Sequence, residues 1–329
     1  MSGKRYISMF IKRFLQSCLL CICCQGLAQQ DPLSTQYMNS QFSINPAYAG
    51  VRNALSMHLV ARQQWMGMEG APVSYLFGMH SPINKTKMSF GGLLSFNQAG
   101  PVQSSQFSGA YSYIVRISNK LLLSLGVSAS LNNTSIGFTG LDVIDHDDPS
   151  FSSDVQNKLS PNFGAGAFLF SRQFYFGCSV PHILNTEIKD SEAGNVISKV
   201  ERHYYITSGY GFSVGDDMFL KPSCLARIKG GDDLLLDVNT QWLYKELFWI
   251  GASYRLNSTM AFLASIRISK SLSICYSYDF PFANTTLQKG SHEISLSFDS
   301  FSFYKRNKKR EFIRKKKSEK EGIRSIRYF

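Results

Sequence analysis

The sequence predicts an all-β protein, a transmembrane antiparallel up-and-down β-barrel of about 14 strands. Three observations predict it: apolar and small polar residues alternate in segment after segment, these segments have similar lengths, and short and long connections alternate between them. Residues 120–131 show the alternation best. Leu121, Leu123, Leu125, Val127, Ala129 and Leu131 share one face, and Ser124, Gly126, Ser128 and Ser130 share the other. A period of two is typical of a strand. An apolar face opposite a small polar face predicts lipid outside and a wet interior.

Fourteen segments alternate in this way, and each is close to the ~9–11 residues that cross a bilayer at a tilt. They are residues 54–66, 72–81, 88–97, 104–117, 120–132, 162–171, 173–180, 203–214, 217–228, 234–243, 246–256, 260–269, 271–280 and 291–303. Pro222 falls inside the ninth segment and lacks the N–H that a ladder needs, so we expect a β-bulge there. A closed ring is expected because an open sheet would leave unpaired edges, whereas closure pairs every backbone group in lipid.

The connections alternate in length as a barrel requires. If the chain enters from the periplasm, the even-to-odd connections are short periplasmic turns, at residues 82–87, 118–119, 172, 215–216, 244–245 and 270. The odd-to-even connections include the two longest, 133–161 and 181–202, followed by 281–290, and we expect them outside the cell. An even number of strands returns the chain to its starting side. The sequence therefore predicts a bacterial outer-membrane protein with periplasmic N- and C-termini.

Residues 1–28 have the features of a secretory signal peptide: a basic start, an apolar run and small residues before Gln29. We expect cleavage after Ala28. The apolar run is shorter than the ~20 residues that a membrane-spanning helix needs. A lipoprotein signal at Cys18 or Cys24 is the alternative, and the residues before these cysteines fit it poorly. The predicted organisation is a signal peptide, a periplasmic segment at 29–53, a barrel at 54–304 and a basic C-terminal tail at 305–329.

The positive charge lies at the two ends of the chain. The formal net charge is +12, of which residues 1–28 contribute +4 and residues 305–329 contribute +9. The body is nearly neutral. The tail is expected in the periplasm, where it has no nucleic acid to bind. A dense run of like charge is usually solvated and disordered, and docking to an acidic partner or to anionic lipid headgroups is the alternative.

A series of short motifs runs through residues 36–298. They are Gln36-Tyr37-Met38, Asn45-Pro46-Ala47-Tyr48-Ala49-Gly50, Arg62-Gln63-Gln64-Trp65-Met66-Gly67, Gly70-Ala71-Pro72, Phe176-Gly177-Cys178-Ser179-Val180-Pro181, Leu220-Lys221-Pro222-Ser223, Gly251-Ala252-Ser253-Tyr254-Arg255, Tyr276-Ser277-Tyr278-Asp279 and Ser291-His292-Glu293-Ile294. In order and spacing they resemble the PorP/SprF outer-membrane proteins of the type IX secretion system. The segment 305–329 goes beyond that family's pattern.

This resemblance implies a non-catalytic part of a protein export machine. Similar proteins either tether a periplasmic ring of the secretion and gliding apparatus to the outer membrane, or help to export and hold one large surface protein. The implied partners are outer-membrane lipids, periplasmic ring proteins or lipoproteins, and such a secreted protein. A porin or a hydrophobic-solute transporter is the alternative, because other fourteen-stranded barrels do that work.

The candidate partner-binding or family-motif residues are Asn45, Pro46, Ala47, Tyr48, Trp65, Tyr278, Asp279, His292 and Glu293. The first four precede the first strand, where they could plug the lumen, meet a partner or cap the strand through a proline turn. Trp65 is expected at the external interface, since indoles favour the headgroup level. The last four are the motif residues of the final two strands.

Charged residues also fall on lumen-facing positions, namely Arg62, Arg116, Arg255, Arg267, Asp237, Asp279 and Glu293. They can pair there and hold the barrel shut or wet, and a substrate path is the alternative. The acidic loop 142–148 offers oxygen ligands for a hard cation, but it lacks the ordered pattern of a calcium loop. The sequence has no Gly-rich phosphate loop, Ser/His/Asp order or acid–base pair, so we predict no enzyme, no metal site and no cofactor.

Overall fold

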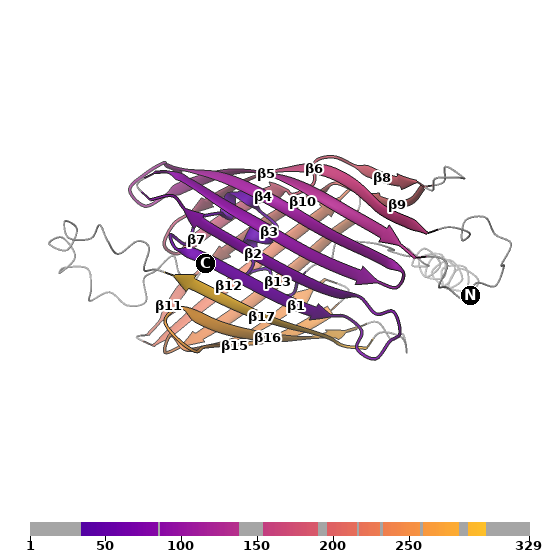
Figure 1. Cartoon of the computed structure of the whole chain (residues 1–329). Helices are drawn as coiled ribbons and strands as arrows, with labels where there is room; N and C mark the ends of the chain where they lie inside the picture. The colour runs from indigo at the N-terminus through magenta and orange to yellow at the C-terminus, as the bar shows by residue number, and fades with distance from the viewer. Residues whose placement is uncertain are drawn as a thin grey trace, which may run out of the picture. The chain divides into compact units, whose positions relative to one another are not determined.

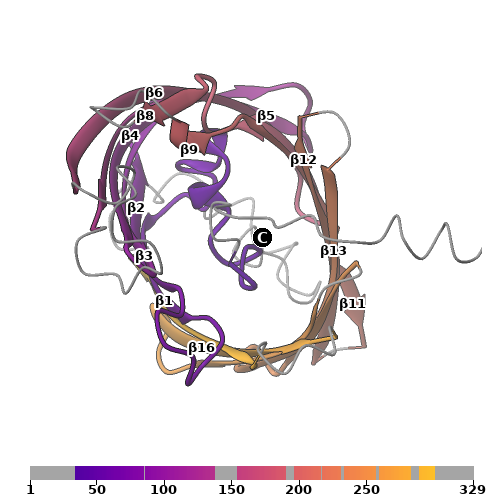
Figure 2. The same ribbon diagram turned by 90° about the vertical axis from the view of Figure 1, so that its right-hand side faces the viewer.

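The computed structural model describes residues 34–84, 86–137, 154–189, 196–215, 217–230, 233–256, 259–282 and 289–300. The predicted signal peptide, the acidic loop 142–148 and the basic tail lie outside these ranges. The described strands form a closed antiparallel ring (Figures 1 and 2). Two short 3₁₀-helices precede the first strand. None of the helices in the described ranges has the length and apolar character to cross a bilayer.

The elements are η1 (Gln41–Ser43), η2 (Pro46–Tyr48), β1 (Leu55–Gln63), β2 (Val73–Pro82), β3 (Met88–Ala99), β4 (Val102–Arg116), β5 (Leu122–Ile136), β6 (Val155–Phe170), β7 (Phe174–Val180), β8 (Thr186–Lys189), β9 (Val196–Val200), β10 (His203–Tyr210), β11 (Phe212–Val214), β12 (Met218–Lys229), β13 (Asp233–Tyr244), β14 (Phe248–Arg255), β15 (Thr259–Arg267), β16 (Leu272–Pro281) and β17 (Ser291–Ser300). Each strand of the ring pairs with its neighbours in the chain, β1 pairs with β17, and β10 pairs with β12. Because β10 and β11 are two parts of one strand along β12, the ring has fourteen strands. The predicted fold class is confirmed.

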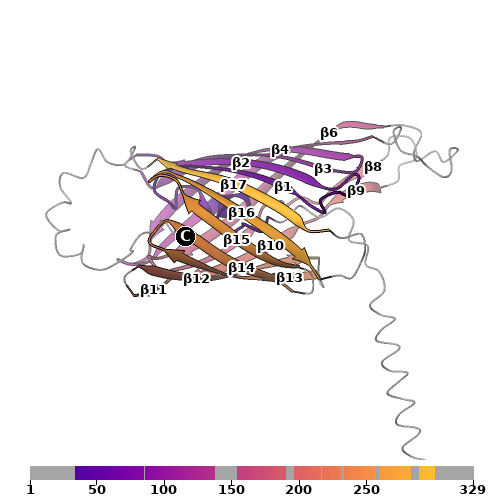
Figure 3. The ribbon, with the colours of Figure 1, turned by 90° about the horizontal axis from the view of Figure 1, so that it is seen from below.

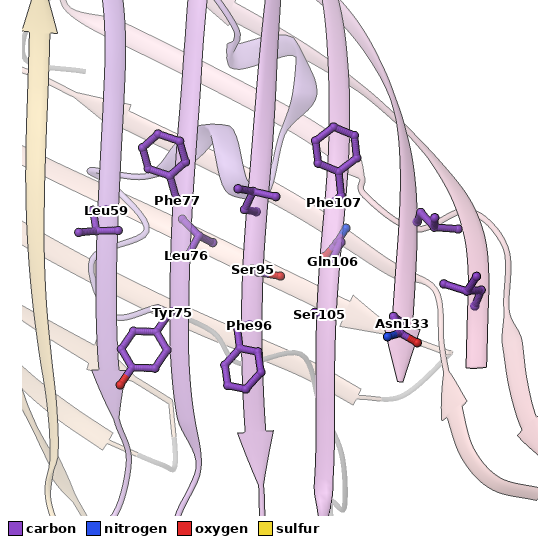
Figure 4. Close-up of a pocket in the computed structure, with 13 residues that line it drawn as sticks. Leu59, Tyr75, Leu76, Phe77, Ser95, Phe96, Ser105, Gln106, Phe107 and Asn133 are labelled. Atoms are coloured by element: carbon purple, nitrogen blue, oxygen red, sulfur yellow. The ribbon is translucent and has the colours of Figure 1, made fainter. Parts of the chain in front are cut away.

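Alternation of side chains across the wall has the predicted direction. In β5, Ser124 is fully buried and faces the lumen, whereas Leu125 and Val127 are 49% and 55% exposed on the outer wall. The same wall carries aromatic rings on β2 to β4. Figure 4 shows Tyr75, Phe96 and other side chains around a shallow apolar hollow of about 430 Å³ on this surface. An outer wall of this kind matches the apolar band that lipid covers in membrane barrels.

The two ends of the barrel differ in their connections. At one end, here called the loop end, β1 is followed by β2, and the two longest connections leave β5 and β7. At the other, the turn end, β1 begins, β17 ends and every connection is short. The predicted segregation of long and short connections is therefore present. The structure shortens the expected 133–161 loop, because β5 runs to Ile136 and β6 begins at Val155. It also places the two-stranded ribbon β8–β9 in the expected 181–202 loop.

The prediction of a bulge at Pro222 is wrong. On one side Pro222 keeps regular register with β13, opposite Thr240. On the other side, Ser223 pairs with Gly209 of β10 and Leu220 pairs with Phe212 of β11, so the register is the same on both sides of Gly211. Opposite Lys221 and Pro222 the neighbouring strand is interrupted between β10 and β11, while the register continues unchanged beyond the interruption.

A positive charge on the outer wall tests the lipid-facing assignment. We expect Val127→Arg to lower the free energy of unfolding in phospholipid vesicles by about 2–4 kcal/mol, the cost of Arg facing the bilayer midplane. Met66→Arg is the matched control, because Met66 is 50% exposed but lies in the β1–β2 connection. Denaturant titration in vesicles measures both, and an equal cost for the two variants would contradict the assignment.

Candidate functional site in the barrel lumen

Residues 34–54, here called the plug, lie inside the ring of strands (Figure 2). The plug begins near the loop end, where Ser34 donates a hydrogen bond to Glu293, and it reaches the turn end, where Arg52 pairs with Asp299. It therefore runs along the lumen before β1 starts. Residues 34 and 300 consequently lie at opposite ends of the barrel.

Three deeply buried charges of the lumen hold the beginning of the plug. Arg62 of β1 lies 2.6 Å from Asp279 of β16 (Nη2 to Oδ2) and 2.8 Å from Glu293 of β17 (Nη1 to Oε2). All three residues are at most 5% exposed. Arg62 stands directly opposite Glu293 in the β1–β17 register, so this pair bridges the seam that closes the barrel (Figure 3). We call the three residues the seam triad.

The plug adds hydrogen bonds to all three residues of the seam triad. The Thr35 hydroxyl donates to both oxygens of Asp279 at 2.7 and 2.8 Å and accepts from Arg62 Nη1 at 3.0 Å. The backbone N–H groups of Thr35 and Gln36 donate to the two oxygens of Glu293 at 3.0 and 3.1 Å. Buried charges are stabilised only when they are paired and hydrogen-bonded. The plug therefore supplies part of what makes this charge cluster tolerable.

The middle of the plug docks against small residues of β5, β6 and β7. The Asn45 side chain accepts a hydrogen bond from Ala47 N at 2.9 Å, which caps η2, and donates to the Ala167 carbonyl at 3.1 Å. Gly126 lies against the backbone of Ala47, so close that a Cβ there would stand 2.3 Å from the Ala47 nitrogen. Gly166 makes an equally close approach to the Asn45 side chain. Glycine on the wall thus provides the space that the motif needs.

Aromatic and apolar contacts fix the same segment. Tyr48 packs edge-on against Phe168, with ring centroids 5.2 Å apart, and Phe168 stacks on Tyr175 at 5.5 Å. Nearer the loop end, Tyr37 and Met38 are 1% exposed and pack in a second cluster with wall residues. At the turn end Arg52 lies 3.3 Å from Asp299. The plug is thus held by hydrogen bonds to buried carboxylates at the loop end, by an ion pair at the turn end and by close packing between them.

The remaining candidates lie in other places. Tyr278 and His292 point to the outer wall, where their rings meet edge-on with centroids 4.8 Å apart. Trp65 has a positive φ of 45° and lines a hollow of about 150 Å³ at the loop end, together with Arg62 and Asp279. The structure brings Asp279 and Glu293 to the plug. It does not bring Trp65, Tyr278 or His292 into that contact.

Of the other charges predicted in the lumen, some form ion pairs and one is exposed. Arg255 lies 3.2 Å from Asp237, which is 1% exposed. Arg267 lies 3.9 Å from Glu246 of the β13–β14 turn. Arg116 is exposed at the turn end of β4. These charges line the two ends of the lumen, and the buried ones are paired as expected.

Sequence reasoning missed several residues of the docking site. Ser34 and Thr35 carry no distinguishing signal, because short polar residues ahead of a strand are common. The sequence predicts Gly126 on the lumen face, but the closeness of Gly126 and Gly166 to the plug is a tertiary contact that the period of a strand does not record. One signal could have found Gln36, whose side chain donates to Ser277 and to the Glu293 carbonyl, since it belongs to the Gln36-Tyr37-Met38 motif.

The contacts of this site are hydrogen bonds, ion pairs and close packing. Within the described ranges, no group of three or more His, Cys, Asp or Glu residues could hold a metal ion. Both Nη atoms of Arg62 and both carboxylates of the seam triad are engaged with one another or with the plug, so these charges are used for structure. The arrangement holds a segment of the chain inside the barrel.

Comparison with known proteins identifies the family. The family of type IX secretion system membrane proteins, PorP/SprF, matches residues 26–298. The chain belongs to the PorP/SprF family. The resemblance inferred from the motifs is therefore confirmed. PorP/SprF is a family of membrane proteins of the type IX secretion system and is not an enzyme family. No curated protein matches the chain.

Solved outer-membrane proteins have similar barrels. Omp33 of Acinetobacter baumannii is 9% identical, with 75% of this chain and 99% of that chain covered, at a TM-score of 0.44. The toluene transporter TodX of Pseudomonas putida is 11% identical, with coverage of 78% and 92% and a TM-score of 0.45. The toluene transporter TbuX of Ralstonia pickettii is 10% identical, with coverage of 81% and 93% and a TM-score of 0.47. At these identities the likeness concerns the fold alone, that of an outer-membrane β-barrel.

Removal of one charge from the seam triad tests its role. We expect Arg62→Met to lower the free energy of unfolding by about 3–5 kcal/mol, because two buried carboxylates lose their partner. The triple variant Arg62→Met, Asp279→Asn, Glu293→Gln should unfold at a higher denaturant concentration than the single variant, since it leaves no buried charge unpaired. Denaturant titration of the refolded barrels measures both, and a triple variant that is less stable than the single one would contradict the charge argument.

A methyl group at the docking surface tests the plug. We expect Gly126→Ala to displace Ala47, to cost about 1–3 kcal/mol of stability by overpacking, and to raise ion conductance in planar bilayers. Gly109→Ala on β4 is the matched control, because a Cβ there meets nothing within 4 Å. If both variants conduct like the unsubstituted protein, the close contact between Gly126 and the plug does not control the lumen.

Proposed function

We propose that this PorP/SprF protein is a non-catalytic component of the type IX secretion and gliding machinery that works by binding. The barrel anchors it in the outer membrane. There it either anchors the periplasmic machinery or assists the export and surface attachment of a large secreted protein. Its partners would be periplasmic ring proteins or lipoproteins, and one such exported protein.

One observation carries this proposal: the lumen holds a plug that is docked along the described wall. Hydrogen bonds to Asp279 and Glu293 hold one end, the Arg52–Asp299 ion pair holds the other, and glycines of three strands receive its middle. A barrel that served as an open pore would gain nothing from such closely matched surfaces in its interior. A barrel that serves as an anchor gains rigidity from them, because a filled lumen resists deformation when force acts on the wall.

The proposed orientation places the turn end in the periplasm and the loop end outside the cell, as in other outer-membrane barrels. Ser300 then faces the periplasm, with the basic tail following it. Ser34 faces outward, and we propose that the signal peptide is removed after Ala28. The plug would thus present its first residues, beside the seam triad, to the exterior.

Transport of small or hydrophobic solutes is the alternative function. It requires a path past the plug, which extends from Glu293 at the loop end to Asp299 at the turn end. Solute flux would therefore require the plug to move. Purified protein distinguishes the two functions, because a transporter carries solute without any partner.

Two measurements together test the proposal. We expect liposomes that contain the purified protein to show no sugar-dependent swelling, because the plug occupies the lumen. We also expect deletion of the gene to abolish surface display of an exported protein, and a full-length copy to restore it. Affinity purification of the intact complex followed by mass spectrometry should recover periplasmic or exported partners. Rapid swelling together with normal surface display in the deletion strain would favour the transporter.

A further inference from the structure

A hollow of about 150 Å³ opens at the loop end of the barrel, where β1 runs into the β1–β2 connection and β17 begins. We call it the loop-end hollow. Its lining includes Arg62 and Asp279 of the seam triad, and side chains of β14, β15 and the chain just before β17 contribute to it. A cavity of about this volume holds one six-membered ring. The hollow therefore has room for a small ring compound or for one unit of a longer chain.

Trp65 is fixed at this hollow by the backbone around it. Its N–H donates a hydrogen bond to Ser291 Oγ at 3.3 Å, and the N–H of Met66 donates to the Gly290 carbonyl at 3.1 Å. These bonds tie the β1–β2 connection to the start of β17. The φ of Trp65 is 45°, a left-handed conformation that a bulky residue rarely adopts. Backbone strain of this kind concentrates at binding sites, and here it accompanies an indole that lines a hollow.

Polar groups with unused hydrogen-bonding capacity line the same hollow. Within the described ranges, the Trp65 indole N–H and the Gln64 side-chain amide bind no other protein group. The Lys289 ammonium makes one long contact, 3.4 Å to the Gly67 carbonyl, and keeps two N–H groups for a further partner. Ser291 accepts from the Trp65 backbone, so its hydroxyl proton can be donated to a ligand.

The charges in the lining are largely paired, which distinguishes this hollow from an anion site. Arg62 is paired with Asp279, and Arg255 lies 3.2 Å from Asp237. Lys289 is the one other charged residue that the structure describes in the lining. A ligand would therefore be recognised by its shape, by contact with the indole and by hydrogen bonds rather than by net charge. Specific pockets typically combine an aromatic or apolar surface with a few placed polar groups in this way.

A saccharide ring has the matching surface. Its axial C–H groups form an apolar face that packs on an indole, and the hydroxyls around its edge each donate and accept hydrogen bonds. We propose that the loop-end hollow binds one saccharide unit of a glycan, with the sugar face against Trp65 and the hydroxyls toward Gln64 and Lys289. This inference goes beyond the proposed function and rests only on its orientation, in which the loop end faces the exterior. There the glycan belongs either to an outer-membrane lipid or to an exported protein.

Binding of two fluorescently labelled glycans to purified, full-length protein tests the inference. One probe is the outer-membrane polysaccharide of the producing bacterium, freed of lipid, and the other is the glycan pool released from the proteins that the bacterium secretes. The protein is kept in a detergent without a sugar headgroup, because a glycosidic detergent would compete. Fluorescence anisotropy should show saturable binding of at least one probe, and the probe that binds identifies the source of the glycan.

Substitutions in the hollow should weaken that binding. We expect Trp65→Leu to weaken it by about tenfold, since a tryptophan at the centre of a contact commonly carries this share of the affinity. Trp65→Phe, which keeps an aromatic face, should weaken it less. Gln64→Ala leaves the indole in place and should also weaken it, so the test holds even if Trp65→Leu fails to fold. The matched control is Trp242→Leu, because Trp242 is 55% exposed on the outer wall of β13 and lies outside the lining of the hollow.

Each outcome decides the matter. Weaker binding by the variants of the hollow but not by Trp242→Leu, with heat-modifiable gel mobility unchanged, supports the site. Failure of both probes to bind overturns it, as does equal binding by the hollow variants and the control. Displacement of the bound glycan by equimolar hexaserine, which offers hydroxyls on a peptide without a sugar ring, also overturns it. The measurement needs no secretion machinery, so a failure of the proposed function would appear separately, as normal surface display in the deletion strain.

Discussion

The closure of β1 against β17 is the contact on which the rest of the structure depends. Its lumen face carries a ladder of polar pairs in exact register: Ser56 with Asp299, His58 with Ser297, and Arg62 with Glu293. Thr35 and Gln36 of the plug bind to the loop end of this ladder. The seam that joins the first strand to the last is thus also the attachment site of the plug, so that closing the ring and filling it are parts of one set of interactions.

This link between ring closure and plug attachment gives a reason for the buried charges of the seam triad. A buried ion pair adds little net stability relative to apolar residues of the same size, but it strongly penalises arrangements that leave one partner alone. If β17 were displaced by one residue along β1, Glu293 would point away from Arg62, because a one-residue slip moves every side chain to the other face. The seam triad therefore favours one register of closure and one position of the plug. Its contribution is chiefly to specificity.

The ring could be predicted from the sequence, and the plug contacts could not. Alternation of Leu125 and Val127 with Ser124 and Gly126 is a local property that a membrane wall imposes on every strand. The number of strands, and the side chains that face lipid or the lumen, could therefore be predicted. The docking of Asn45 on Gly166 depends on residues more than one hundred positions apart, and no local period records it. The regular register at Pro222 could not be predicted either, because the interruption opposite it lies in another strand, between β10 and β11. The placement of Trp65 depends on a positive φ that strand periodicity does not anticipate.

The path of the plug also constrains how the protein is built. Residue 54 joins the plug to β1 at the turn end, while Ser34 is held beside Glu293 at the loop end. The plug must therefore enter from the turn end after the ring closes, or the ring must close around it. Docking surfaces on β5 to β7 form between neighbouring strands and need no closed seam, whereas the Thr35 contacts need β1, β16 and β17 together. An order in which η2 docks first and closure of the seam fixes Thr35 last satisfies both requirements, and it leaves no stage at which the buried carboxylates face an empty, closed lumen.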